Sequence, residues 1–118
     1  MRKKLLFILN DAHYFISHRL NIALEAQKIN YEVHIAAQNI DDHKLIEQYG
    51  FKFHPLQLSR SGVNVFYELS SFYELYKLLK KIQPNVLHLV TIKPVIYGSI
   101  ISRILNIPKV IAAIPGLG

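Results

Sequence analysis

The chain has 118 residues, a length that suits a single domain. Hydrophobic residues make up 51% and charged residues 19%, a balance that excludes a disordered chain. There is no cysteine, which excludes disulfides and thiolate metal sites, and the net charge of +6 favours phosphate-bearing or anionic partners. Basic residues do not form a stripe interleaved with aromatic ones, so nucleic acid is not an expected partner.

The N-terminal segment is predicted to be a strand and not a targeting signal. The apolar run Leu5–Leu9 is too short for a signal peptide and is interrupted by Asn10–His13. No stretch approaches the roughly 20 apolar residues of a membrane span. We therefore expect a cytoplasmic protein that begins with a buried strand.

In the first half of the chain, strand and helix patterns alternate. Leu5–Leu9 is continuously apolar, as in a strand buried on both faces of a parallel sheet. Phe15–Asn30 has helical spacing, and Tyr31–Ala37 is a second strand. A short helix is expected over Asp41–Gly50, with Asp41 or Asp42 as its N-cap and Gly50 as its left-handed end.

The second half continues the alternation. Phe51–Pro55 alternates apolar and polar residues and contains a proline, which predicts an edge strand. Val65–Gln83 is a long helix, and a later helix ends near Asn106, with Pro94 at its favoured first position. The remaining strands are Val86–Val90 and Lys109–Ile114. This order predicts an α/β fold with a doubly wound, parallel, Rossmann-like sheet in strand order 3-2-1-4-5.

In such a sheet, ligands bind beyond the carboxyl ends of the strands. The loops that meet there are Asn10–Tyr14, Gln38–Ile40, Ser59–Asn64, Thr91–Lys93 and Pro115–Gly118. The first of these loops has no glycine, so it lacks the dinucleotide-binding fingerprint, and there is no Walker A pattern.

Two cations in these loops are candidates for an anion site. Lys93 precedes Pro94 at a helix N-terminus, where backbone N–H groups and the helix dipole favour anions. Arg60 lies in a Ser-Arg-Ser-Gly loop that could reach a phosphate. For either residue alone, a solvated surface cation is the commoner explanation.

Candidates for acid–base chemistry are few. Asp11 is the one carboxylate at a strand's carboxyl end, and Asn10 and Asp11 either cap the first helix or contact a ligand. His13 is the one histidine in a site loop and is a candidate general acid or base. His18, one turn into the helix, points back at the site or only packs. The six histidines show no metal-ligand spacing, so no metal is expected.

Four short stretches indicate a family, and their order spans nearly the whole chain. They are Ser17-His18-Arg19, Leu58-Ser59-Arg60, His88–Pro94 and Gly116-Leu117-Gly118. On these residues the chain resembles the N-terminal domain of family-4 glycosyltransferases, which are GT-B enzymes with two Rossmann-like domains facing across a cleft. The subgroup it resembles most builds bacterial surface polysaccharides.

The resemblance implies that residues 1–118 form one N-terminal domain that holds mainly the acceptor. A C-terminal domain absent from this chain would hold the donor, so the chain alone should be inactive. The implied reaction moves a sugar from a nucleotide-sugar donor to a glycan or polyprenyl-linked acceptor, with retained anomeric configuration and no metal cofactor. From their positions in the loops described above, His13 is the candidate catalytic residue, and the candidate substrate-binding residues are Asn10, Asp11, Tyr14, His18, Arg60, Thr91, Lys93, Gly116 and Gly118.

Two other functions stay open on the sequence. One is a stand-alone, non-catalytic module that binds a sugar or phosphate. The other is a GT-B relative that epimerises a nucleotide-sugar.

Two surfaces are expected to meet partners. Val110–Ile114 is a strongly apolar edge strand that should self-associate. The helix Val65–Gln83 carries many aromatic rings and three lysines near its end, Lys77, Lys80 and Lys81. Either its aromatic face packs on the sheet and the lysines are solvated, or surplus rings lie at the cytoplasmic face of a membrane with lysines on anionic headgroups.

Overall fold

The structure is a computed structural model that describes residues 2–38, 42–56 and 65–114. Its five strands form one parallel sheet in the order β3-β2-β1-β4-β5, so the predicted fold class and strand order are confirmed. The strands are β1 (Lys4–Asp11), β2 (Glu32–Gln38), β3 (Lys52–Pro55), β4 (Val86–Val90) and β5 (Lys109–Ala113). The helices are α1 (Ala12–His18), α2 (Leu20–Lys28), α3 (His43–Gln48), α4 (Val65–Ile82) and α5 (Ile92–Leu105).

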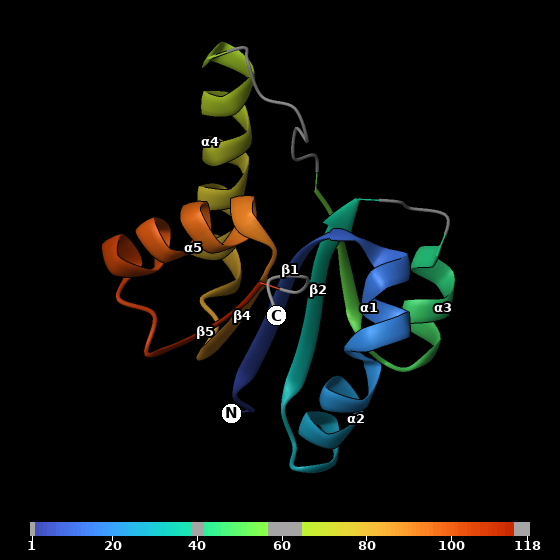
Figure 1. Cartoon of the computed structure of the whole chain (residues 1–118). Coiled ribbons are helices and arrows are strands. Elements are labelled where there is room, and N and C mark those ends of the chain that lie inside the picture. The colour runs from blue at the N-terminus through green and yellow to red at the C-terminus, as the bar shows by residue number, and fades with distance from the viewer. Residues whose placement is uncertain (1, 39–41, 57–64, 115–118) are drawn as a thin grey trace.

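Helices cover both faces of the sheet (Figure 1). On one face α1, α2 and α3 lie over β1, β2 and β3, and on the other α4 and α5 pack over the centre and the β4–β5 side. β1 supplies both cores, with Leu5, Phe7 and Leu9 in one and Leu6 and Ile8 in the other. The prediction that the first strand is buried on both faces is therefore confirmed.

The helix predicted over Phe15–Asn30 is wrong in one respect, because it is two helices. Arg19, with φ −121° and ψ −6°, leaves the helical region and separates α1 from α2. Phe15 of α1 and Ala23 of α2 are both fully buried in the same core, so both helices pack on one face of the sheet.

The later helix also differs from its prediction at its start. α5 begins at Ile92, so Pro94 is its third residue and not its first. Proline is tolerated there because the first-turn N–H groups have no partner within the helix. One turn on, Gly98 packs against Leu89 so closely that an added Cβ would lie 2.4 Å from a Leu89 methyl carbon. This contact brings α5 down onto β4.

Both edge strands match their predictions. β3 ends in Pro55 at one edge, and β5 forms the other, with Lys109–Ala112 exposed. The predicted self-association through β5 stays a prediction. Among the described residues, no helix is long and apolar enough to cross a membrane.

A buried histidine pair joins β2 to β3 under α4. His34 Nδ1 lies 2.9 Å from His54 Nε2, and the rings stack. If His54 donates, the remaining proton of His34 sits on Nε2, which faces Glu32 Oε2 at 3.8 Å. Burial, and then the neighbouring His54, lower the pKa of His34 to about 4. Burial, followed by Lys81 and Lys52, also lowers the pKa of His54.

We predict that this pair makes the fold less stable in mild acid. The unfolded histidines titrate near pH ~6.5, whereas the folded ones resist protonation, so the unfolded state binds more protons below that pH. Stability should be complete above pH ~6.5 and should fall by on the order of 1–2 kcal/mol towards the folded pKa of His34, about 4. Urea unfolding at a series of pH values measures this slope.

The variant His34→Gln should flatten the slope, because glutamine does not titrate. His18→Gln, which removes an exposed histidine, is the matched control and should keep the slope. Equal slopes in both variants would show that the buried pair is not responsible.

Candidate functional site

The candidate site lies at the carboxyl edge of the sheet, where α1, α3, α4 and α5 begin. β1 and β4 are neighbours in the sheet, but the chain leaves them towards opposite faces, to α1 and to α5. This is the switch point at which open α/β sheets bind ligands. The pairing of β1 with β2 is irregular between Ile8 and Asp11, so half-buried Asn10 lies at a disturbed strand end.

Asp11 caps α1, which is one of the two roles predicted for it. Its Oδ1 accepts a hydrogen bond from the backbone N–H of His13 at 2.9 Å. The cap leaves the ring of His13 on the rim, with its side chain 73% exposed. His13 Nδ1 lies 3.9 Å from Asp42 Oδ2. The structure thus pairs the predicted acid–base histidine with a carboxylate.

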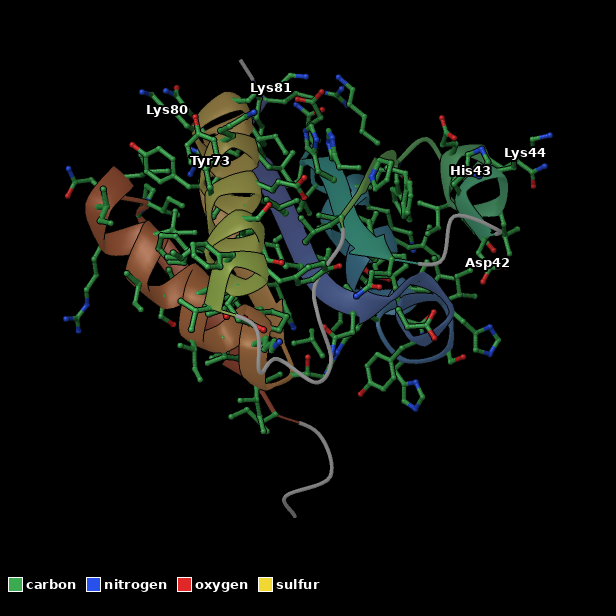
Figure 2. All side chains as sticks on the ribbon, turned by 90° about the horizontal axis from the view of Figure 1, so that it is seen from above. Asp42, His43, Lys44, Tyr73, Lys80 and Lys81 are labelled. Atoms are coloured by element: carbon green, nitrogen blue, oxygen red, sulfur yellow. The ribbon has the colours of Figure 1, made fainter. Side chains whose placement is uncertain are left out.

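Asp42 was expected only as a helix cap. It does occupy the N-cap position of α3, but its side chain makes no capping hydrogen bond. Figure 2 shows Asp42 at the end of α3 where the chain enters the helix. Its carboxylate is instead within ion-pair range of His13. The strand order could have predicted this pair, because β1 and β2 are neighbours in the sheet and the helices that follow them begin at the same sheet edge.

One turn into α1, His18 stacks on Tyr14, with ring centroids 4.2 Å apart and planes 9° apart. His18 is exposed and Tyr14 is half-buried. Of the two roles predicted for His18, the structure shows packing, as a stacking contact along the helix. The stack gives the rim a flat aromatic surface next to His13.

Thr91 is the most strained residue of the edge. Its φ of 73° and ψ of 173° lie in a region that only glycine visits readily. The backbone N–H of Thr91 donates to the carbonyl of Ala113 at 2.9 Å, which ties the end of β4 to β5. The Oγ1 atom of Thr91 is buried without a hydrogen-bond partner among the described residues. Strain of this kind gathers at ligand sites, where surrounding structure holds it in place.

Lys93 is held by a carboxylate that the sequence reading missed. Lys93 Nζ lies 2.6 Å from Glu68 Oε1, and the hydroxyl of Tyr97 donates to Glu68 Oε2. These contacts, Lys93 first, lower the pKa of the Glu68 carboxyl. Glu68 in turn raises the pKa of Tyr97 to about 12. The cluster clamps the start of α5 to the first turn of α4, so Lys93 is not the simply solvated cation considered above.

His88, in the middle of β4, is a second polar residue to which the sequence alone gave no individual role. It is 6% exposed, and its ring centroid lies 4.8 Å from that of Phe7. Burial, and then the charge of Arg19, lower the pKa of His88. His88 belongs to a stretch that carried the family resemblance, but a strand interior gives no sign of a polar role.

Other predicted site residues cannot be placed in this way. Arg60, Gly116 and Gly118 lie outside the described residues. Within the described ranges, no group of three histidine, aspartate or glutamate residues is arranged to hold a metal ion.

The chain matches one family model, described as glycosyl transferase 4-like, over residues 4–118. No curated protein matches it. Among solved structures, MurG of Acinetobacter baumannii is similar over 94% of this chain, with a TM-score of 0.71 and 15% identity. A glycosyltransferase of Rickettsia africae ESF-5 is similar over 94% as well, with a TM-score of 0.69 and 12% identity.

A third similar structure is a UDP-GlcNAc 2-epimerase of Neisseria meningitidis bound to UDP-GlcNAc. It covers 90% of this chain, with a TM-score of 0.62 and 18% identity. The matched region spans 34%, 29% and 30% of the MurG, Rickettsia and Neisseria chains, respectively. At these identities the likeness establishes the fold, which is the Rossmann-like half of GT-B proteins.

We predict that the strain at Thr91 reverses the usual ranking of alanine and glycine. Thr91→Gly should be more stable than Thr91→Ala by about 1 kcal/mol, because only glycine relieves the backbone. At an unstrained site, glycine would be the less stable by roughly 0.5–1 kcal/mol. Urea unfolding of both variants measures the difference. A Thr91→Ala variant at least as stable as Thr91→Gly would refute the strain.

Proposed function

The chain belongs to the glycosyl transferase 4-like family, and we propose that it forms the acceptor-side domain of an enzyme that transfers a sugar from a nucleotide-sugar donor. The acceptor is a glycan or a lipid-linked glycan of surface polysaccharide synthesis. The observation that carries this proposal is the family match over residues 4–118. The polar, strained carboxyl edge, with exposed His13 at its rim, supports it.

In the proposed reaction, an acceptor hydroxyl oxygen bonds to the anomeric carbon of the donor sugar. The bond from that carbon to the donor phosphate breaks, and the acceptor hydroxyl loses its proton. His13 suits the role of proton acceptor. Its Nδ1 lies on the side of the ring towards Asp42, at 3.9 Å from Oδ2, so we propose that Nε2 takes the proton from the acceptor.

The donor phosphates are proposed to approach Thr91 and Lys93. An incoming phosphate would compete with Glu68 for the Lys93 ammonium, so binding would loosen the clamp between α4 and α5. Arg60, Gly116 and Gly118 remain proposed substrate ligands on the sequence argument alone.

A lipid-linked acceptor is supported by the outer face of the α4–α5 layer. Phe66 is 83% exposed and Leu69 61%, and both belong to the first turns of α4. The N-terminal end of α4 projects beyond the sheet edge (Figure 1). Exposed isoleucines recur every fourth residue of α5, at Ile92, Ile96, Ile100 and Ile104. Large exposed apolar side chains on neighbouring helices are typical of an interaction surface when they form one patch. We propose that this outer face contacts the cytoplasmic face of a membrane.

A second candidate function is nucleotide-sugar epimerisation, because three of the similar structures are titled UDP-N-acetylglucosamine 2-epimerases. A non-catalytic sugar- or phosphate-binding module is the third. The two enzymes differ in a simple way, since an epimerase needs no acceptor and releases no nucleotide.

We expect the 118-residue chain to bind an acceptor without turning over a donor. In the proposed enzyme, a second domain completes the cleft, and closure around both substrates assembles the site. Nuclear magnetic resonance titration with a soluble polyprenyl-linked glycan should shift the His13 and Tyr14 signals, while UDP release from UDP-sugars stays at background. Turnover by the chain alone would contradict the two-domain arrangement.

Joined to a donor-binding domain, the chain should support transfer that His13→Ala lowers by about 100-fold, the usual contribution of a general base. His43→Ala, which removes a half-buried histidine on α3, is the matched control and should leave the rate unchanged. Epimerised UDP-sugar formed without an acceptor would favour the second candidate instead.

We also predict binding to lipid vesicles through the outer face. The variant Phe66→Gln/Leu69→Gln/Ile96→Gln should reduce co-sedimentation with vesicles by at least about tenfold, because each buried apolar side chain contributes about 1.5–3 kcal/mol. The control Ile29→Gln/Leu45→Gln removes exposed apolar residues on the other side of the sheet and should bind like wild type. Equal loss in both variants would refute a defined membrane face.

A further inference from the structure

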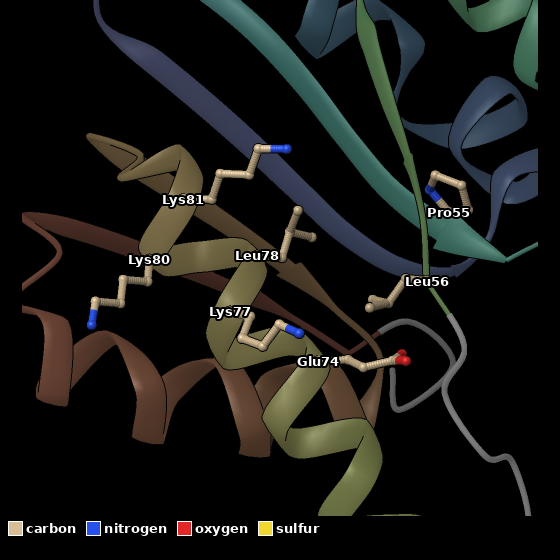
Figure 3. Close-up of a pocket in the computed structure, with 7 residues that line it drawn as sticks. All are labelled: Pro55, Leu56, Glu74, Lys77, Leu78, Lys80 and Lys81. Atoms are coloured by element: carbon tan, nitrogen blue, oxygen red, sulfur yellow. The ribbon is translucent and has the colours of Figure 1, made fainter.

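A groove runs between α4 and the end of β3, on the opposite side of α4 from α5. Its volume is about 620 Å³, and it is lined by Pro55, Leu56, Glu74, Lys77, Leu78, Lys80 and Lys81. Figure 3 shows its two walls, with the helix on one side and the chain leaving β3 on the other. None of its residues belongs to the carboxyl-edge site described above.

The charge of the groove is positive. Lys77 and Lys81 are one helical turn apart, so their stems rise on the same face of α4. In Figure 3 both side chains extend towards the groove, whereas the Lys80 ammonium points to the other side of the helix. Within the described residues, Lys77 and Lys81 have no carboxylate within 4.0 Å, and Lys77 instead lies over the Tyr73 ring at 5.2 Å.

His54 lies beside the groove, close to one of its lysines. His54 immediately precedes Pro55, and the charges of Lys81 and Lys52 add to burial in lowering its pKa. The α4 dipole accounts for lysines in the last helical turn, Lys80 and Lys81, but not for Lys77 or for a hollow beside them.

The walls between the two ammonium groups and the strand end are apolar. Leu56 is buried, Leu78 is half-buried, and Pro55 presents its ring. Glu74 lies next to Leu56 in Figure 3, at the end away from Lys81, and would repel an anion there. The α4 wall of the groove therefore carries Lys77 and Lys81 with Leu78 between them, and the facing wall is apolar.

We infer that this groove binds a phosphate ester that carries an alkyl chain, with the phosphate between Lys77 and Lys81 and the chain along Leu78, Leu56 and Pro55. Two like charges one turn apart destabilise a helix, and a phosphate placed between them removes that repulsion. The inference stands apart from sugar transfer, because it rests on the lining of the groove and not on catalysis.

Calorimetric titration of the 118-residue chain with monomeric dodecyl phosphate tests the site. Wild type should bind it, and Lys77→Gln and Lys81→Gln should each weaken binding by about tenfold, as for loss of one charged hydrogen bond. Lys80→Gln is the matched control, with the same charge change on the same helix, and should stay within about twofold of wild type. Circular dichroism melting confirms that all three variants fold.

Further ligands test the phosphate and the alkyl chain one at a time and compare a free phosphate ester with a lipid headgroup. Inorganic phosphate should bind more weakly than dodecyl phosphate, affinity should rise from hexyl to dodecyl phosphate, and dodecyl maltoside should not compete. Phosphatidic acid in vesicles should show the same ranking of the three lysine variants if its headgroup enters the groove.

Two results would overturn the inference. If Lys80→Gln weakened binding as much as Lys81→Gln, a diffuse positive surface would be responsible. If inorganic phosphate bound as well as the dodecyl ester, the apolar wall would have no role. Neither result depends on transferase activity, so failure of the groove and failure of the proposed function remain distinguishable.

Discussion

The whole architecture depends on burying β1 on both faces. Successive side chains of a strand point to opposite sides, so an unbroken apolar run such as Leu5–Leu9 is stable only between two hydrophobic layers. Leu5, Phe7 and Leu9 enter the core beneath α1 and α2, and Leu6 and Ile8 enter the core beneath α4 and α5. With β1 central, the chain leaves β1 and its neighbour β4 towards opposite faces, and the carboxyl ends of β1 and β4 form the switch point.

At that edge, polar groups are matched across elements that are distant in the chain. His13 meets Asp42 from the start of α3, and Lys93 meets Glu68 from the start of α4. Thr91, at the start of α5, has a backbone conformation that normally requires glycine. A site made from helix starts and strand ends is stiff, because the sheet fixes the position of every element that contributes to it.

The side chains of α4 lie in three different environments. Leu75 and Leu79 enter the core, Phe66 and Leu69 are exposed on its first turns, and the side with Lys77 borders the groove at β3. A sheet-packing helix needs only one apolar stripe. The extra apolar and cationic surface is what supports the two proposed ligand contacts, one with a membrane and one with a single amphiphilic anion.

The sequence alone predicted the strands, their order, most of the helices and the sheet edge at which a ligand is expected, because strand and helix periods are local and parallel alternation allows few topologies. It also gave capping as one of two roles for Asp11 and predicted β3 and β5 as edges. Which side chains meet was decided only by tertiary structure. The break at Arg19, the approach of Asp42 to His13, the clamp of Glu68 on Lys93 and the pairing of His34 with His54 all join residues through sheet register or helix packing. No local period encodes these contacts, since each depends on how far a neighbouring element has been shifted and rotated when its apolar face is buried.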